Sequence, residues 1–104
     1  TAAYASSKLA INGLTTILSG ELGRHGIRVN GVCPGLIDPS RLDDMGRGAA
    51  WSGLVKAFIP LGRAGTGEDI AHAVAFLCSE QGSWISGQNL YVDGGYTNVP
   101  LMGA

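Results

Sequence analysis

The sequence has 104 residues, of which 45% are hydrophobic and 14% are charged, and its formal net charge is −1. This size suits one globular domain, and the balanced charge, without a basic run, gives no sign of a surface for nucleic acid or anionic membranes. No apolar run approaches the roughly 18 residues of a membrane span, and the first residues lack the order of a signal peptide. We therefore expect neither nucleic acid nor membrane among the partners.

The chain does not begin with methionine, which is consistent with a fragment or a processed chain. Its two cysteines, Cys33 and Cys78, each stand in an apolar segment. We expect them to be buried free thiols in a reducing compartment, which predicts a cytoplasmic location.

The first predicted element is a helix over residues 2–25. Apolar residues recur along it with a helical period and predict one buried stripe, made of Ile11, Leu14, Leu18 and Leu22. Gly13 and Gly20 interrupt this helix at some cost in helix propensity, and such glycines usually let another backbone approach closely. Gly26 is placed to serve as a left-handed cap.

A short strand is predicted over residues 27–33, because the run IRVNGVC is partly β-branched and is stopped by Pro34-Gly35. Residues 36–59 then form a loop that leads into a short amphipathic helix, which Pro60 ends.

A third helix is predicted over residues 67–79. Thr66 offers an N-cap and Asp69, three residues later, completes a capping box. The expected core stripe of this helix consists of Ile70, Val74 and Leu77. A second strand over residues 89–93 ends at Asp93-Gly94-Gly95.

A helix, a tight turn and a strand in succession are typical of an α/β protein. The sequence predicts about three helices but only two strands, and parallel strands need cover on both faces. The rest of such a sheet must come from chain outside this sequence or from another molecule.

Tyr4 and Lys8, within the run YASSK, lie one helical turn apart on the same face. A cation close to a phenol stabilises the phenolate, so the phenol can exchange a proton with an alcohol or a carbonyl. The three N–H donors of the lysine can also hold ribose hydroxyls. The alternative is a core phenol beside a solvated lysine, because this pair is common by chance.

Pro34 and Gly35 end a strand and begin a long loop. Ligands of open α/β sheets bind outside the carboxyl ends of the strands, so this turn is placed to offer backbone groups to a ligand. A plain turn is the alternative.

Four motifs occur in a specific order along the chain: YASSK, LGRHGIRVNGVCPG, PLGRAGTGEDIAHAVAFLCSE and SGQNLYVDGG. In this order the chain resembles the short-chain dehydrogenase/reductase family from Tyr4 to about Gly95. The resemblance implies the C-terminal half of a Rossmann-like doubly wound parallel sheet, within a single domain that residues 1–104 only partly cover. Asn30, Asp93 and the paired glycines look like structural positions of the family.

The resemblance also implies roles for individual residues. Tyr4 would be the catalytic acid/base, and Lys8 would assist it and bind the nicotinamide ribose. NAD or NADP would lie along Pro34, Gly35, Leu36, Ile37 and Pro39. The loop from Asp38 to Gly48 and the short helix after it look like a substrate lid, in which Leu42, Met45 and Trp51 are candidate substrate contacts; Trp51 and Phe58 could equally pack the small helix. No metal site is expected, because the histidines and cysteines are too far apart.

Three departures from the family pattern stand out. Pro39 replaces a threonine that often bonds the carboxamide, and Gly67 replaces a common proline. The family's phosphate loop, ribose selector, catalytic serine and assisting asparagine all precede the tyrosine, and none is in this sequence. Enoyl reductases of the superfamily place six residues between tyrosine and lysine, which leads here to Ile11, so the spacing favours carbonyl–alcohol chemistry.

The resulting hypothesis is an NAD(P)-dependent oxidoreductase that interconverts a secondary alcohol and a ketone. The family is usually dimeric or tetrameric, so we expect a homo-oligomer, with a homotetramer as the specific prediction. The alternative is a truncated, non-catalytic module that oligomerises or complements another fragment.

Overall fold

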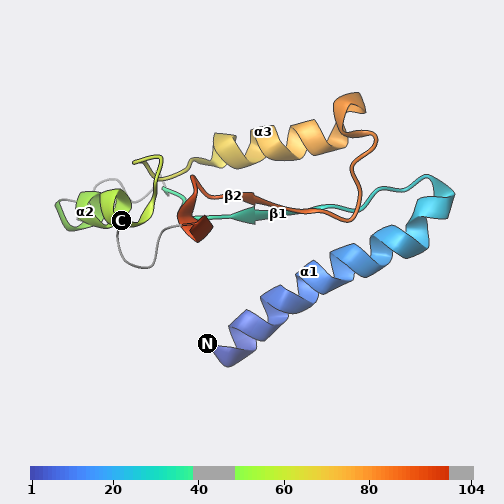
Figure 1. Cartoon of the computed structure of the whole chain (residues 1–104), viewed down its shortest axis with the longest axis horizontal. Coiled ribbons are helices and arrows are strands. Elements are labelled where there is room, and N and C mark those ends of the chain that lie inside the picture. The colour runs from blue at the N-terminus through green and yellow to red at the C-terminus, as the bar shows by residue number, and fades with distance from the viewer. Residues whose placement is uncertain (39–48, 99–104) are drawn as a thin grey trace. The chain divides into compact units, whose positions relative to one another are not determined.

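The computed structural model of the chain describes residues 1–38 and 49–98 (Figure 1). Within them the elements follow in the order α1 (Ala2–Leu22), β1 (Gly31–Pro34), α2 (Ala49–Phe58), α3 (Gly67–Cys78) and β2 (Asn89–Val92). Short 3-10 turns occupy Gly23–His25, Glu80–Gly82 and Tyr96–Asn98. β1 and β2 pair as a two-stranded parallel sheet, which confirms the predicted fragment of two strands and about three helices.

Strand β1 begins four residues later than the predicted strand over 27–33. Before Gly31, side chains satisfy part of the backbone: the Val29 N–H donates to Ser86 Oγ over 3.2 Å. The sheet bonding starts where the Gly31 N–H donates to the Gln88 carbonyl over 2.8 Å. The β-branched run therefore marks an extended segment, of which only the last part is strand.

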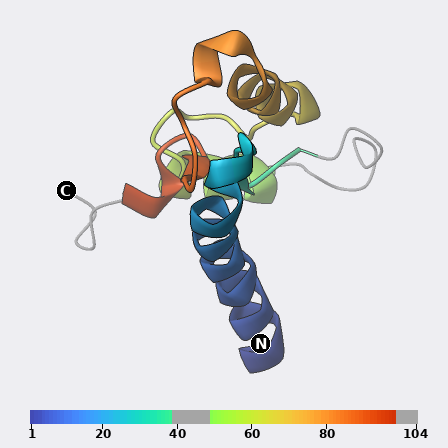
Figure 2. The same cartoon turned by 90° about the vertical axis from the view of Figure 1, so that its right-hand side faces the viewer.

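The chain divides into two compact units, Thr1–Cys33 with Ala73–Leu90, and Pro34–His72 with Tyr91–Ala104. In the first unit, α1 is one uninterrupted helix (Figures 1 and 2). It is followed by a 3-10 turn and by Gly26, whose φ of 74° confirms the predicted left-handed cap.

The predicted apolar stripe of α1 is only partly covered. Leu18 and Leu22 are half-buried, whereas Ile11 and Leu14 are exposed, so the expected burial is wrong for these two residues. Thr15 is instead the buried residue of the helix, and its hydroxyl donates to the Ile11 carbonyl. The physical reason is that no described segment packs over the Ile11–Leu14 face.

The glycines of α1 also differ from expectation. A Cβ added at Gly13 or Gly20 would meet no atom of the described chain within 4 Å. The close backbone approach predicted for them is therefore not found among the described residues.

Arg28 and Asn30 tie the first unit together. The Arg28 guanidinium donates to the Leu77 carbonyl near the end of α3, where helix carbonyls lack intrahelical partners. The Asn30 amide donates to the Ile85 carbonyl over 2.9 Å and accepts from the Gln88 N–H over 3.1 Å. Asn30 is thus a structural residue, in agreement with the sequence prediction.

Helix α3 confirms Leu77 as a core residue but not the rest of its predicted pattern. Val74 is exposed and Ile70 is half-buried. Cys78 is a free thiol and exposed, so its predicted burial is wrong, and Cys33 is free and half-buried. Successive helix residues point about 100° apart, so Cys78 leaves the covered face on which Leu77 lies.

The N-terminus of α3, in the second unit, has the predicted capping box. The Asp69 N–H donates to Thr66 Oγ1 over 3.2 Å, and the Thr66 N–H donates to Asp69 Oδ2 over 2.8 Å. Arg63 adds two hydrogen bonds to the Asp69 carboxylate. The side-chain hydrogen bond from Arg63 holds the pKa of Asp69 well below its ordinary value. Gly67 is the first residue of this helix.

Candidate functional site

Tyr4 and Lys8 face each other on the first turns of α1. The Lys8 ammonium lies 5.4 Å from the centroid of the Tyr4 ring, within cation–π range. The Tyr4 side chain is 69% exposed, and Lys8 makes no ion pair within the described chain. Within the described chain, the Tyr4 phenol is therefore exposed beside the Lys8 ammonium.

The segment Pro34 to Ile37 lies at the carboxyl end of β1, in the second unit. The Gly35 N–H donates to the Val92 carbonyl over 3.0 Å and holds this segment against the end of β2. A Cβ at Gly35 would lie 2.6 Å from Asp93 Cβ and 2.8 Å from Asp93 Cα. Only glycine allows these two segments of the chain to approach this closely.

Ile37 continues the edge as a parallel bridge to Gly65. In this bridge the Gly65 N–H donates to the Leu36 carbonyl over 2.9 Å, and the Asp38 N–H donates to the Gly65 carbonyl over 2.8 Å. Among the described residues, no partner takes the N–H groups of Leu36 and Ile37 or the Ile37 carbonyl. These open backbone groups fit the donor and acceptor pattern of a carboxamide, which has both an N–H₂ and a C=O.

The turn after β2 supports this segment. Both Asp93 oxygens are engaged, since Oδ1 accepts from the Gly95 N–H over 3.0 Å and Oδ2 accepts from the Thr97 N–H over 3.1 Å. Partial burial raises the pKa of Asp93, but the hydrogen bonds from Thr97 and Gly95 outweigh it and hold the pKa below its ordinary value. Gly94 and Gly95 supply the positive φ angles, 63° and 91°, that this turn requires. Asp93 is therefore a structural carboxylate, as predicted.

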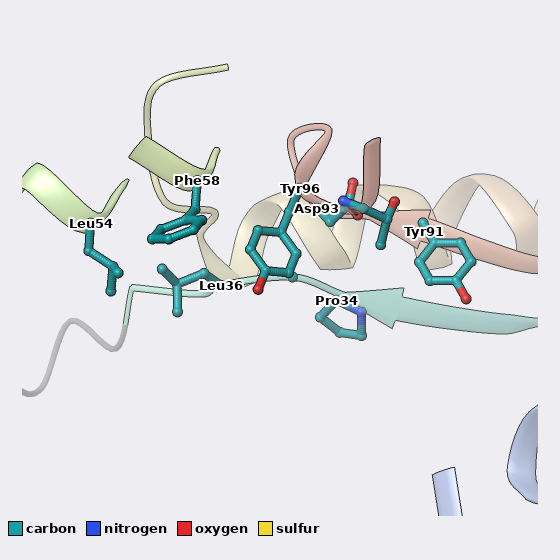
Figure 3. A pocket seen from close by; sticks show the side chains of 9 residues that line it. Pro34, Leu36, Leu54, Phe58, Tyr91, Asp93 and Tyr96 are labelled. Atoms are coloured by element: carbon teal, nitrogen blue, oxygen red, sulfur yellow. Dashed lines mark hydrogen bonds between the residues drawn. The ribbon is translucent and has the colours of Figure 1, made fainter. Parts of the chain in front are cut away.

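A cavity of about 450 Å³ opens beside these two turns, entirely within the second unit (Figure 3). Its lining comes from the end of β1, from α2 and from β2 with the turn that follows: Pro34, Gly35, Leu36, Leu54, Phe58, Tyr91, Asp93, Tyr96 and Thr97. The volume lies in the range typical of small-molecule sites.

The structure divides the sequence-predicted residues into separate groups. Tyr4 and Lys8 belong to the first unit, whereas Pro34, Gly35, Leu36 and Ile37 belong to the second. Trp51 is half-buried on α2 and is not among the residues that line the cavity, whereas Phe58 is. The remaining predicted contacts lie outside the described residues: Pro39, Leu42 and Met45.

Leu54, Tyr91 and Tyr96 line the cavity but were not predicted from the sequence. Tyr96 follows directly on the turn that ends β2, so the rule that pointed to Pro34 could have found it. Leu54 stands four residues before Phe58 on one helical face, which is also a sequence signal. Tyr91 had no such signal, because its strand is short and its neighbours alternate only weakly.

Two further findings concern the described chain as a whole. None of its helices is long and apolar enough to cross a membrane. No cluster of three histidine, cysteine, aspartate or glutamate side chains suited to a metal ion occurs in residues 1–38 and 49–98.

Comparison with known proteins gives a consistent result. The sequence profile of a family described as enoyl-(acyl carrier protein) reductase matches residues 1–97. The chain is also 47% identical to mouse (3R)-3-hydroxyacyl-CoA dehydrogenase over 92 residues, which is 88% of the chain and 35% of that relative.

Solved structures agree with the sequence matches. One of 4-hydroxyisoleucine dehydrogenase complexed with NADH superposes with a TM-score of 0.83 at 35% identity, covering 92% of this chain and 40% of that one. A crystal structure of an Agrobacterium tumefaciens protein with bound NADP superposes with a TM-score of 0.79 at 37% identity, covering 90% and 38%. The chain thus spans well under half the length of these relatives.

Proposed function

The chain belongs to the short-chain dehydrogenase/reductase family, and from this premise we propose that the protein is an NAD- or NADP-dependent oxidoreductase that interconverts a secondary alcohol and a ketone. The observation that carries the proposal is the exposed Tyr4 phenol with the Lys8 ammonium beside it. NADH and NADP in the two structural relatives support the choice of cofactor.

In the proposed mechanism the nicotinamide cofactor supplies the hydride chemistry when it is bound. Tyr4 accepts the hydroxyl proton of the alcohol at its phenol oxygen, or donates that proton to the ketone oxygen in the reverse direction. Lys8 stabilises the phenolate form and holds ribose hydroxyls with its remaining N–H donors. The open backbone groups of Leu36 and Ile37 would hold the carboxamide, with no need for a hydroxyl at Pro39.

The profile description mentions enoyl reductases, but the spacing of Tyr4 and Lys8 favours carbonyl–alcohol chemistry. The mouse relative and 4-hydroxyisoleucine dehydrogenase are both named as dehydrogenases, which gives no support to a non-catalytic module. The proposal also includes a homo-oligomer, a dimer or tetramer, in the cytoplasm. The exposed apolar face of α1 and the free thiols of Cys33 and Cys78 support these two points.

The test is made on protein expressed from the complete gene. Secondary alcohols and ketones are supplied with NAD(H) and NADP(H), and the change in nicotinamide absorbance is followed. Tyr4→Phe should lower kcat by roughly 10²- to 10⁴-fold, the usual contribution of a positioned acid/base, with an unchanged circular dichroism spectrum. Full activity of Tyr4→Phe would overturn the assignment of the acid/base.

Lys8→Met should lower kcat and also raise the KM for the nucleotide, because it removes both the charge and the ribose contact. Lys56→Met is the matched control, since Lys56 is an exposed lysine on α2 outside the cavity lining. Equal effects of the two substitutions would refute the role proposed for Lys8.

A further inference from the structure

The cavity of the second unit has an apolar lining whose character does not follow from the proposed reaction. Phe58, Tyr91 and Tyr96 present aromatic rings to it, and Pro34, Leu36 and Leu54 present aliphatic groups (Figure 3). The ring-bearing side chains remain about half exposed, so a ligand in the cavity would remove apolar surface from water.

The polar groups of the lining offer little to a charged ligand. Asp93 is the acidic residue among them, and both its oxygens already accept hydrogen bonds from the turn. None of the described residues that line the cavity is a lysine, arginine or histidine. The described part of the lining therefore offers no cation with which to bind a carboxylate or a phosphate.

Helix α2 is anchored in a way that keeps the cavity open. Val55, together with Ile59 just after the helix, is buried on one face. Leu54 and Phe58 each stand one residue before a member of this buried pair, and they line the cavity from the adjacent face of the helix. Because the buried pair fixes the rotation of the helix, the cavity-lining pair is held in place without ligand.

The cavity also adjoins the segment proposed for the nicotinamide, since Pro34, Gly35 and Leu36 belong to both. We propose that it binds the apolar part of the substrate, so that the protein acts on secondary alcohols or ketones that carry an alkyl or alicyclic body. This inference rests on the proposed function. The mouse relative and 4-hydroxyisoleucine dehydrogenase do not decide it, because their names refer to an acyl thioester and to a hydroxylated amino acid respectively.

The experiment compares substrates of increasing length on protein from the complete gene. kcat/KM is measured for 2-butanol, 2-hexanol and 2-octanol, and for 3-hydroxybutyrate as an anionic compound of short length. Each methylene buried should raise kcat/KM up to about fourfold, and 3-hydroxybutyrate should be no better than 2-butanol. A flat series, or a preference for 3-hydroxybutyrate, would overturn the inference while leaving the oxidoreductase function intact.

Substitutions in the cavity lining test which residues cause the rise of kcat/KM with substrate length. Phe58→Ala and Leu54→Ala should each lower kcat/KM for 2-octanol about tenfold or more and change that for 2-butanol much less. Phe76→Ala is the matched control, because Phe76 is 44% exposed against 47% for Phe58 and does not line the cavity. Leu54 is also partly exposed, so its variant tests the inference if Phe58→Ala fails to fold. Equal loss for both alcohols in both cavity variants would contradict the inference.

A binding measurement separates the inference from the proposed function. Saturation-transfer NMR detects 2-octanol bound to wild-type protein and to Tyr4→Phe, whether or not turnover occurs. If the wild-type protein turned over none of the alcohols, 2-octanol binding that Leu54→Ala weakens and Phe76→Ala does not would support the cavity assignment and refute the reaction. Absence of 2-octanol binding, as would follow if a second copy or further chain filled the cavity, would overturn the inference.

Discussion

Helices α1 and α2 use their apolar residues in opposite ways. α1 has 21 residues, yet Thr15 is the one that the described chain buries. α2 has 10 residues, and Val55 within it and Ile59 directly after it are 6% and 3% exposed. The shorter helix is therefore fixed by its own unit, whereas the longer one has an apolar face that the described chain leaves uncovered. Burial depends on what packs against a helix and not on its length.

The largest expected effect contrasts a buried with an exposed isoleucine. Ile59→Ala should lower the free energy of unfolding by about 2–5 kcal/mol, because it leaves a cavity in the core of the second unit. Ile17→Ala, on the 61% exposed side chain of α1, should change it by less than about 0.5 kcal/mol in the chain 1–104. Urea unfolding followed by circular dichroism measures both. A loss at Ile17 as large as that at Ile59 would show that the α1 face is covered in solution.

A somewhat smaller effect is expected at Gly35. The added methyl group of Gly35→Ala would overlap the backbone of Asp93, which cannot give way like a flexible side chain. We expect a destabilisation of about 1–3 kcal/mol in the same unfolding experiment. Gly53→Ala is the control, because its Cβ would meet no atom of the described residues within 4 Å, and the substitution should stabilise α2 by up to about 1 kcal/mol. Comparable values for the two would disprove the close approach at Gly35.

Loss of the α3 N-cap should cost less. Thr66→Ala removes the hydroxyl that accepts from the Asp69 N–H, and we expect a destabilisation of about 1 kcal/mol. Thr16→Ala is the comparison in α1, where the hydroxyl bonds only to the Asn12 carbonyl one turn back. Thr66→Ser should restore the cap. If Thr66→Ser were as unstable as Thr66→Ala, the cap would not be the cause.

The smallest expected effect is on the pH dependence of the free energy of unfolding. The hydrogen bonds to Asp93 hold its pKa below the ordinary value of 3.8, so the ionised carboxylate stabilises the folded state. This contribution is fully present above the unfolded pKa and is lost as the pH falls through the folded pKa. Unfolding free energies measured from pH 6 to pH 2 should thus fall below about pH 4. Asp93→Asn should flatten this part of the profile, and an unchanged profile would argue against the role of Asp93.

Local patterns were the ones that sequence analysis predicted well. Three of them depend on residues within one turn of each other: the capping box of Thr66 and Asp69, the left-handed cap at Gly26, and the placement of Tyr4 and Lys8 on one helix face. The limits of β1 were predicted less well, since the bond from Val29 to Ser86 connects residues far apart in the chain.

Burial and the cavity needed the tertiary structure. The stripe of α1 has the right period, but Ile11 and Leu14 lack a described partner, and periodicity cannot reveal that. Likewise, the sequence did not decide whether Phe58 lines a pocket or packs the small helix. The residues that line the same cavity, Leu36 and Tyr96, come from distant segments of the chain.

The sequence by itself determined the α/β class, the family and the spacing of the candidate acid/base pair, because each of these depends on short-range order along the chain. Tertiary structure alone decided that Asp93 is committed to its turn, that the Ile37 backbone groups have no partner among the described residues and that the described lining of the cavity beside them is apolar. These properties arise from hydrogen bonds and packing between segments that only folding brings together.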